Sequence, residues 1–211
     1  GFETALAQKY LDKNTFIAEF QQVRKTKKTM GDLIEILNSS AYFPIKEYIM
    51  YQTQNLPFDE RKALLEAAMN TNSVQVRQAV AETVKVIPSV FKSQYETLLN
   101  DASYKTKEIA LGNLWRNFPE DRLHYLELTK AIEGNNDKSF KLTWLALAMN
   151  TENISEQTQL ECYEKLLDYA SINYESSVGQ NALELLLEVN QTKKKVIALL
   201  FQTTTHHKWQ F

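Results

Sequence analysis

Apolar residues recur along this chain at the spacing of buried helix faces. Small or aliphatic residues form columns when the chain is shifted by 31 positions: Ile49, Val80 and Leu111 in one, Met50, Ala81 and Gly112 in another, and Tyr48, Ala79 and Ala110 in a third. Ile45 and Val76, three or four positions earlier, complete an i, i+3, i+4 pattern that indicates helices packed on neighbours. No stretch has the period-two alternation and turn dipeptides typical of a sheet.

Three prolines keep the same register. Pro57, Pro88 and Pro119 stand 31 residues apart, and each follows a large apolar residue. Proline fixes φ near the helical value, lacks an N–H and disfavours helix at the preceding residue, so it suits the start of a helix and marks the end of the one before. The spacing therefore predicts pairs of antiparallel helices separated at these prolines.

Turn residues and caps divide the chain into expected helices. Asn14 and Thr29 are predicted caps near the N-terminus, and Asn153 with Glu156 is predicted to form a capping box. The regular pairs are expected at 41–56 with 58–69, 74–87 with 89–100, and 104–118 with 120–133. The flanking helices are expected at 3–12, 15–26, 30–38, 138–149, 154–170, 176–189 and 192–203.

These elements predict an all-α fold. We expect a right-handed α-solenoid, or superhelix, of antiparallel helix pairs of HEAT or armadillo type, with about ten or eleven helices. No linker of distinct composition interrupts the chain, so the whole of 1–211 is expected to be one repeat domain. Its regular pairs cover about 41–133, between irregular flanking helices at 1–40 and 134–211.

Composition narrows the possible functions. The 211 residues are 44% hydrophobic and carry a net charge of −2, which supplies a core and removes the electrostatic argument for nucleic-acid binding. No run approaches the roughly 20 apolar residues of a membrane span, and no signal peptide is recognisable, so we expect a soluble protein, cytoplasmic or periplasmic. The start at Gly1 without methionine favours a piece of a longer protein.

Motifs for catalysis and cofactors are absent from the sequence. The chain has no H-E-x-x-H pair, phosphate-binding loop, dinucleotide fingerprint or nucleophile elbow, so we predict no catalytic residue, no metal ligand and no cofactor. Cys162, Trp115 and Trp144 lie in apolar stripes and are expected in the core. His124 and the pair His206–His207 are expected to have no specific role.

Four basic residues are the candidate ligand or partner surface. Repeat scaffolds bind through side chains that project from one helix of each pair onto a shared face. In the 31-residue register Lys46 aligns with Arg77, and Lys85 aligns with Arg116. The alternative for Lys85 and Arg116 is stabilisation of a helix C-terminus by a positive charge.

Two resemblances refine these expectations. The segment 72–84, with its Val76-Arg77 pair after a polar turn, resembles the second helix of a HEAT repeat, although the period of 31 is shorter than usual. Asn14-Thr-Phe-Ile-Ala-Glu-Phe20 and Asn113-Leu-Trp-Arg-Asn-Phe-Pro119 resemble parts of the C-terminal helical domain of bacterial gluzincin zinc aminopeptidases. That resemblance implies an accessory domain that packs on a catalytic domain holding the zinc and helps to enclose its substrate chamber.

Three functions follow as hypotheses. The first is a non-catalytic module of a zinc aminopeptidase, whose partner is a catalytic domain in the same polypeptide and whose zinc lies in that domain. The second is a free-standing scaffold that binds a protein or peptide. The third is a HEAT-like DNA-repair protein, which would need a basic concave face; the near-neutral charge and Glu108, which breaks the column of Lys46 and Arg77, argue against it.

Overall fold

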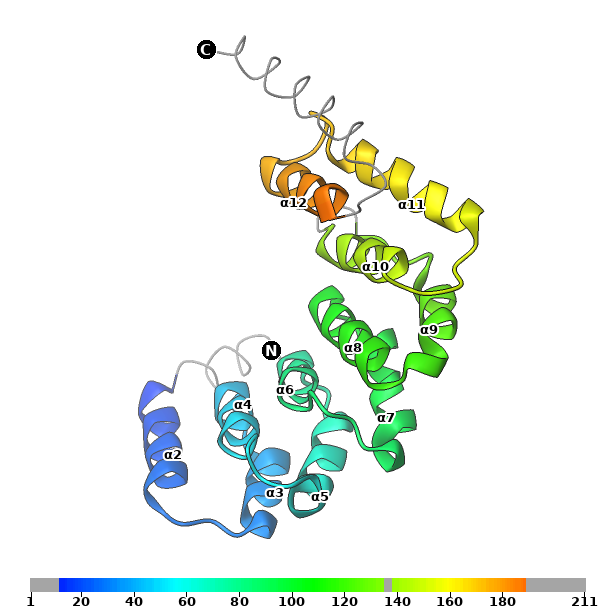
Figure 1. Cartoon of the computed structure of the whole chain (residues 1–211). Coiled ribbons are helices and arrows are strands. Elements are labelled where there is room, and N and C mark those ends of the chain that lie inside the picture. The colour runs from blue at the N-terminus through cyan, green and yellow to red at the C-terminus, as the bar shows by residue number, and fades with distance from the viewer. Residues whose placement is uncertain (1–11, 135–137, 189–211) are drawn as a thin grey trace, which may run out of the picture. The chain divides into compact units, whose positions relative to one another are not determined.

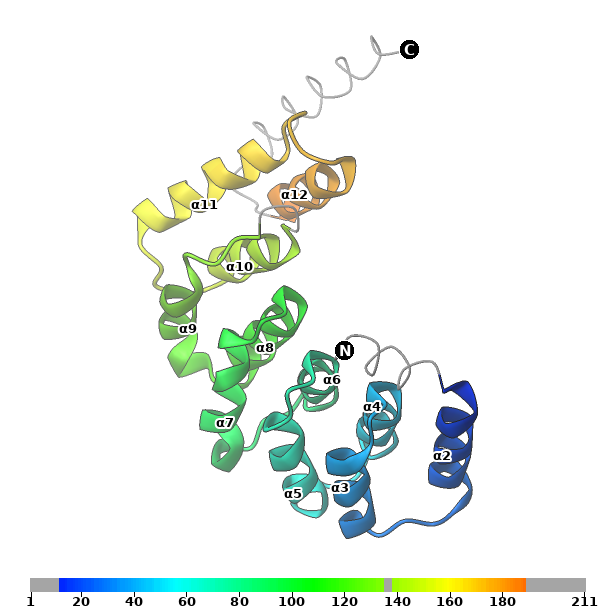
Figure 2. The same cartoon turned by 180° about the vertical axis from the view of Figure 1, so that it is seen from behind.

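The computed structural model describes residues 12–134 and 138–188. Within these ranges the chain forms eleven α-helices and three short 3-10 helices, with no strand, which confirms the all-α prediction (Figures 1 and 2). It divides into two compact units between Asn113 and Leu114. The solenoid and the single repeat domain stay predictions, and the helices expected at 3–12 and 192–203 fall outside the described residues except for residue 12.

The first unit consists of short helices joined by tight turns. Its elements are α2 (Lys13–Lys25), α3 (Met30–Ser39), α4 (Phe43–Gln52), α5 (Phe58–Met69), α6 (Val74–Thr83), η1 (Ser89–Phe91), α7 (Lys92–Glu96), η2 (Thr97–Asn100) and the larger part of α8 (Tyr104–Asn117). The helix expected at 89–100 is thus three short segments in sequence.

Helices one repeat apart lie side by side in this unit. Helix α3 packs on α5, and α4 packs on α6, so that successive pairs form two layers. The hydroxyl of Tyr51 on α4 donates a hydrogen bond to the carboxylate of Glu82 on α6, one 31-residue repeat further on in the sequence. Ile49 and Val80, from one predicted column, are both buried. Residues 31 positions apart in the sequence therefore contact each other where α4 stacks on α6.

Two of the helices expected before prolines are shorter than predicted. Helix α4 ends at Gln52 instead of 56, and α6 ends at Thr83 instead of 87. Pro57 and Pro88 each occupy the position before the next helix with extended ψ near 145°. Proline disfavours the helical conformation only at the residue directly before it, here Leu56 and Ile87, so the ends at Gln52 and Thr83 lie earlier than this effect alone requires.

The predicted caps have different outcomes. Thr29 caps α3 in a complete capping box, as predicted. Asn14 is not a cap: it lies inside α2, and the Asp12 side chain accepts the capping hydrogen bond. The capping box predicted for Asn153 is also wrong, because Ser155 caps α11 while Asn153 takes a left-handed conformation with φ of 60°. Asn tolerates that conformation better than most residues, so here it makes the turn that precedes the cap.

The second unit is built around one central helix. After η3 (Pro119–Asp121) come α9 (Arg122–Thr129), α10 (Ser139–Met149), α11 (Glu156–Tyr169) and α12 (Ser176–Glu188), and α10 contacts the other three α-helices. In place of the helix expected at 120–133, the chain forms η3 followed by α9, which ends at Thr129. Trp144 is buried on α10 and donates a hydrogen bond from Nε1 to the Leu126 carbonyl, and Cys162 is buried on α11, both in the core as predicted.

The carboxylate of Glu133, in the chain between α9 and α10, joins its own segment to Lys138 before α10 and to α11. Glu133 Oε1 accepts hydrogen bonds from the Tyr169 hydroxyl at 2.7 Å and from Lys138 Nζ at 2.9 Å, and Lys165 Nζ lies 3.4 Å away. Partial burial opposes ionisation of Glu133, but these hydrogen bonds and positive charges outweigh it and lower its pKa to about 2.

This pKa predicts an acid-dependent loss of stability. A carboxyl group with a lowered folded-state pKa stabilises the fold above its unfolded pKa of about 4.5, and the contribution disappears as the pH falls toward 2. After allowance for solvent screening we expect a loss of about 1–2 kcal/mol. Urea unfolding between pH 6 and pH 2.5 should show a steeper decline for the native chain than for Glu133→Gln. Equal declines would contradict the assignment.

Candidate functional site

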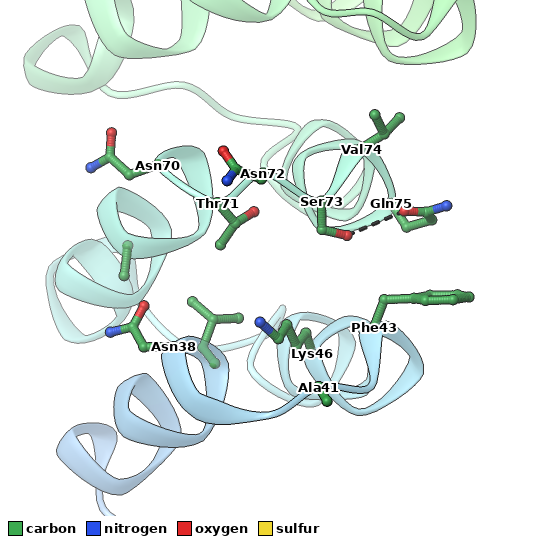
Figure 3. A pocket seen from close by; sticks show the side chains of 12 residues that line it. Asn38, Ala41, Phe43, Lys46, Asn70, Thr71, Asn72, Ser73, Val74 and Gln75 are labelled. Atoms are coloured by element: carbon green, nitrogen blue, oxygen red, sulfur yellow. Dashed lines mark hydrogen bonds between the residues drawn. The ribbon is translucent and has the colours of Figure 1, made fainter. Parts of the chain in front are cut away.

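A polar groove lies between two successive turns of the first unit. It has a volume of about 920 Å³ and is bounded on one side by the end of α3 and the start of α4, and on the other by the turn from α5 to α6 (Figure 3). Its lining residues are Leu37, Asn38, Ala41, Phe43, Lys46, Ala67, Asn70, Thr71, Asn72, Ser73, Val74 and Gln75. Tight packing of α3 on α5 and of α4 on α6 holds these two turns opposite each other.

Asparagine amides give the groove its chemical character. Asn38 comes from the α3 side, and Asn70 and Asn72 come from the α5–α6 turn. All three side chains are exposed, and among the described residues none of the three amides has a hydrogen-bond partner. A carboxamide offers two N–H donors and a carbonyl acceptor, the same groups that a peptide backbone requires. The groove therefore presents complementary groups on both sides.

Lys46 contributes a positive charge between the two sides. Partial burial lowers the pKa of its ammonium group, and the Glu19 carboxylate opposes that shift. In Figure 3 the Lys46 side chain reaches toward the α5–α6 turn, with Phe43 beside it. The first turn of α6 starts at Val74, and helix N-terminal N–H groups favour negative charge. The groove thus favours a ligand that carries hydrogen-bonding groups and an acidic group.

Arg77 holds the α5–α6 turn in place by a hydrogen bond to its backbone. Its Nη1 donates a hydrogen bond to the Thr71 carbonyl at 2.6 Å, and its Nε donates to Asp101 Oδ2 at 2.5 Å. The Asp101 side chain is 1% exposed and also accepts a hydrogen bond from the Ser103 N–H. An ion pair with a buried carboxylate therefore holds Arg77, and Arg77 holds the turn that carries Asn70 and Asn72.

The four basic residues predicted from the sequence lie in different surroundings. Lys46 and Arg77 lie on the stacked helices α4 and α6, one lining the groove and the other holding its edge. Lys85 lines a second hollow of the same unit, beyond the end of α6. Arg116 is exposed near the end of α8 and belongs to the second unit. Within the first unit, the structure brings only Lys46 and Arg77 together around the groove.

The asparagines were missed by reasoning from sequence. The candidate residues predicted from the sequence are charged columns on helices, whereas the groove is lined mainly by uncharged residues of the turns. The available signal was the clustering of amide and hydroxyl residues at the ends of two successive repeats, in 38–40 and 70–73. Such clusters are ordinarily interpreted as loops, which is why they did not stand out.

Trp115, His124 and Cys162, which were also considered from the sequence, are not among the residues that line the groove. The Arg122 guanidinium lies over the partly buried indole ring of Trp115, 3.8 Å from the ring centroid. The indole Nε1–H of Trp115 donates a hydrogen bond to Thr151 Oγ1. His124 is exposed on α9. Burial raises the pKa of the Cys162 thiol to about 11. His206, His207 and Trp209 lie outside the described residues.

Neither a membrane-spanning helix nor a metal-binding cluster is found in the described part of the chain. Over residues 12–134 and 138–188, no helix has the length and apolar character needed to cross a membrane. The same described ranges hold no group of three or more His, Cys, Asp or Glu side chains placed to bind a metal ion. The chain matches no family model, no curated protein and no solved structure.

Proposed function

We propose that this chain is a non-catalytic helical module that holds an extended segment of polypeptide in the groove between the α3–α4 and α5–α6 turns. The observation that supports this proposal best is the set of asparagine amides on facing turns, Asn38 on one side and Asn70 and Asn72 on the other, which have no hydrogen-bond partner among the described residues. An extended backbone exposes N–H and C=O groups that need partners, and carboxamides provide both kinds.

The remaining lining residues indicate which segments bind best. Lys46 and the N-terminal turn of α6 favour a segment with an acidic side chain. Phe43, 37% exposed at the groove edge, offers contact to an apolar side chain. We therefore expect a segment in which an acidic residue and an apolar residue lie close together.

The parent protein is proposed to be a zinc aminopeptidase. This narrower proposal depends on the resemblance of 14–20 and 113–119 to the C-terminal helical domain of those enzymes. The bound segment is then a peptide substrate or a strip of the catalytic domain, and the zinc belongs to that domain. The alternative, a free-standing scaffold, uses the same groove for a separate partner.

The gene separates these two proposals. We expect the reading frame that encodes this chain to encode, upstream of it, a domain with H-E-x-x-H, the two-histidine zinc motif of that enzyme family. A stop codon or an unrelated domain at that place would reject the aminopeptidase proposal and leave the groove proposal standing.

Peptide binding tests the groove itself. Selection from a phage-displayed library of random 12-residue peptides is expected to enrich sequences that bind the native chain. Against a synthetic peptide from the selection, Asn72→Ala should weaken binding about three- to tenfold, since a hydrogen bond contributes about 0.5–1.5 kcal/mol. Isothermal titration calorimetry gives both dissociation constants.

Asn173→Ala is the matched control. Asn173 is also an exposed asparagine, but it lies in the second unit, between α11 and α12. Its replacement should leave the dissociation constant unchanged. The proposal fails if no peptide is enriched, or if Asn72→Ala binds the selected peptide as tightly as the native chain does.

A further inference from the structure

A second hollow of the first unit contains a buried arginine. The hollow has a volume of about 450 Å³ and lies between the start of α5 and the chain that leaves α6. Arg61 of α5 lines it and is only 3% exposed. A guanidinium group stays charged at every physiological pH, so this hollow has a permanent positive charge in its wall.

The partners of Arg61 within the chain are neutral. Nη1 donates to the Gln54 carbonyl at 3.1 Å, and Nη2 donates to Thr83 Oγ1 at 2.9 Å. Nε is buried without a hydrogen-bond partner, and no ion pair joins Arg61 to a carboxylate in the described part of the chain. Buried charges are ordinarily paired, because an uncompensated charge is costly to remove from water. Each Nη also has a second N–H beyond the one used in these bonds.

The nearby carboxylate of Glu82 forms no ion pair with Arg61 in the described part of the chain. Glu82 lines the same hollow, but its Oε1 accepts a hydrogen bond from Gln78 and its Oε2 accepts one from the Tyr51 hydroxyl. Its carboxylate thus belongs to the contacts between α4 and α6. Arg61 thus lines an open volume without an ion-pair partner among the described residues.

The rim of the hollow combines a second cation with apolar surface. Lys85 is an exposed lining residue. Leu56 and Val86 also line the hollow, and Val86 is 80% exposed, which is unusual for an aliphatic side chain beside a concave surface. A ligand with a negative group toward Arg61 and an aliphatic group at the rim would match both features.

We propose that this hollow is a second binding site, for an organic carboxylate that carries an aliphatic group. The carboxylate compensates for the Arg61 charge and accepts hydrogen bonds from its remaining Nη protons, while the aliphatic group covers Leu56 and Val86. This site is separate from the polypeptide groove, and the inference does not depend on the proposed function.

N-Acetyl-leucine is the probe that tests this site. It carries one carboxylate and one aliphatic side chain, and N-acetyl-leucinamide is the same molecule without the charge. At constant ionic strength, NMR titration of the whole chain should show saturable shifts with N-acetyl-leucine and at least about tenfold weaker binding of the amide, because a charge-assisted hydrogen bond is lost. Equal binding of the two compounds would overturn the proposal.

Variants locate the binding. Arg61→Met keeps a long side chain without the charge and should weaken N-acetyl-leucine binding about tenfold or more. If this variant does not fold, Val86→Glu provides the test, because it adds a carboxylate at an exposed lining position and should compete with the probe. Val90→Glu adds the same charge at a 75% exposed position in η1, beyond Pro88, and should have a much smaller effect.

Two further results would reject the site, and a third would reject the proposed class of ligand. The first is unchanged binding of N-acetyl-leucine by folded Arg61→Met. The second is an equal effect of Val86→Glu and Val90→Glu on the binding of N-acetyl-leucine. The third concerns the ligand class: inorganic phosphate binding more tightly than N-acetyl-leucine would replace the organic carboxylate by a free oxyanion.

Discussion

Replacing Arg77 by methionine is expected to lower the free energy of unfolding by about 3–5 kcal/mol, the cost of breaking a buried ion pair from one side. Methionine keeps much of the side-chain length but removes the charge that faces Asp101. The Asp101 carboxylate, 1% exposed, would keep only the Ser103 N–H among the hydrogen-bond donors described above. Urea unfolding followed by circular dichroism measures the change.

An exposed ion pair serves as the control. Lys62 lies 3.9 Å from Glu66 on α5, and both side chains are well exposed. Lys62→Met should change the free energy of unfolding by no more than about 0.5 kcal/mol, as is usual for a surface pair. The double variant Arg77→Met/Asp101→Asn should lose less than the sum of the two single losses. An Arg77→Met change as small as that of Lys62→Met would contradict the importance of the buried pair.

The Arg77 variant also has a consequence for binding. The same guanidinium holds the Thr71 carbonyl, next to Asn70 and Asn72 in the turn. Folded Arg77→Met is therefore expected to bind a groove peptide more weakly, without any contact between Arg77 and the peptide. The sequence pattern proposed Arg77 as a surface contact, and this indirect role is a different prediction for the same residue.

Replacing Asn113 by alanine is expected to cost about 2–4 kcal/mol, from a small cavity and lost buried hydrogen bonds. Its buried side chain donates from Nδ2 to the Ala81 carbonyl at 2.9 Å and to the Tyr95 hydroxyl at 2.8 Å. The Tyr95 hydroxyl in turn donates to the same carbonyl at 3.0 Å. The network thus joins α6, α7 and α8 within the first unit.

A double-mutant cycle tests this network. Tyr95→Phe removes only the hydroxyl, and Asn113→Ala combined with it should show a coupling of about 0.5–3 kcal/mol between the two side chains. Asn173→Ala, at an exposed turn, should leave the free energy of unfolding within about 0.5 kcal/mol of the native value. Strict additivity of Asn113→Ala and Tyr95→Phe would mean that the two groups act independently.

The stacking of the first unit was predictable because it depends on local signals that repeat. Prolines mark helix starts through their fixed φ, and columns of small or aliphatic residues mark faces that must be buried. The hydrogen bond from Tyr51 to Glu82 and the buried pair Ile49 and Val80 follow that 31-residue register. Exact helix ends were less predictable, because Ser, Asp and Asn compete for the same cap positions, as Asp12 and Ser155 illustrate.

The groove was not predictable in the same way. Its asparagines are exposed residues at turns, where amide and hydroxyl residues are common, so only the packing of α3 on α5 and α4 on α6 reveals that they face one another. The ion pair of Arg77 joins residues 24 positions apart, which no helical or repeat spacing indicates. Arg61 lies in a polar-looking helix turn of the sequence, and its burial is a result of tertiary packing.

The asparagines of the groove are proposed to contact a bound polypeptide. The most direct measurement is a ¹H–¹⁵N NMR titration of the native chain with a synthetic peptide from the phage selection, following the side-chain NH₂ signals. We predict that the signals of Asn38, Asn70 and Asn72 shift together and saturate at one dissociation constant, while that of Asn173 stays in place. Saturable binding that leaves the three groove signals unshifted and moves signals elsewhere would contradict the claim.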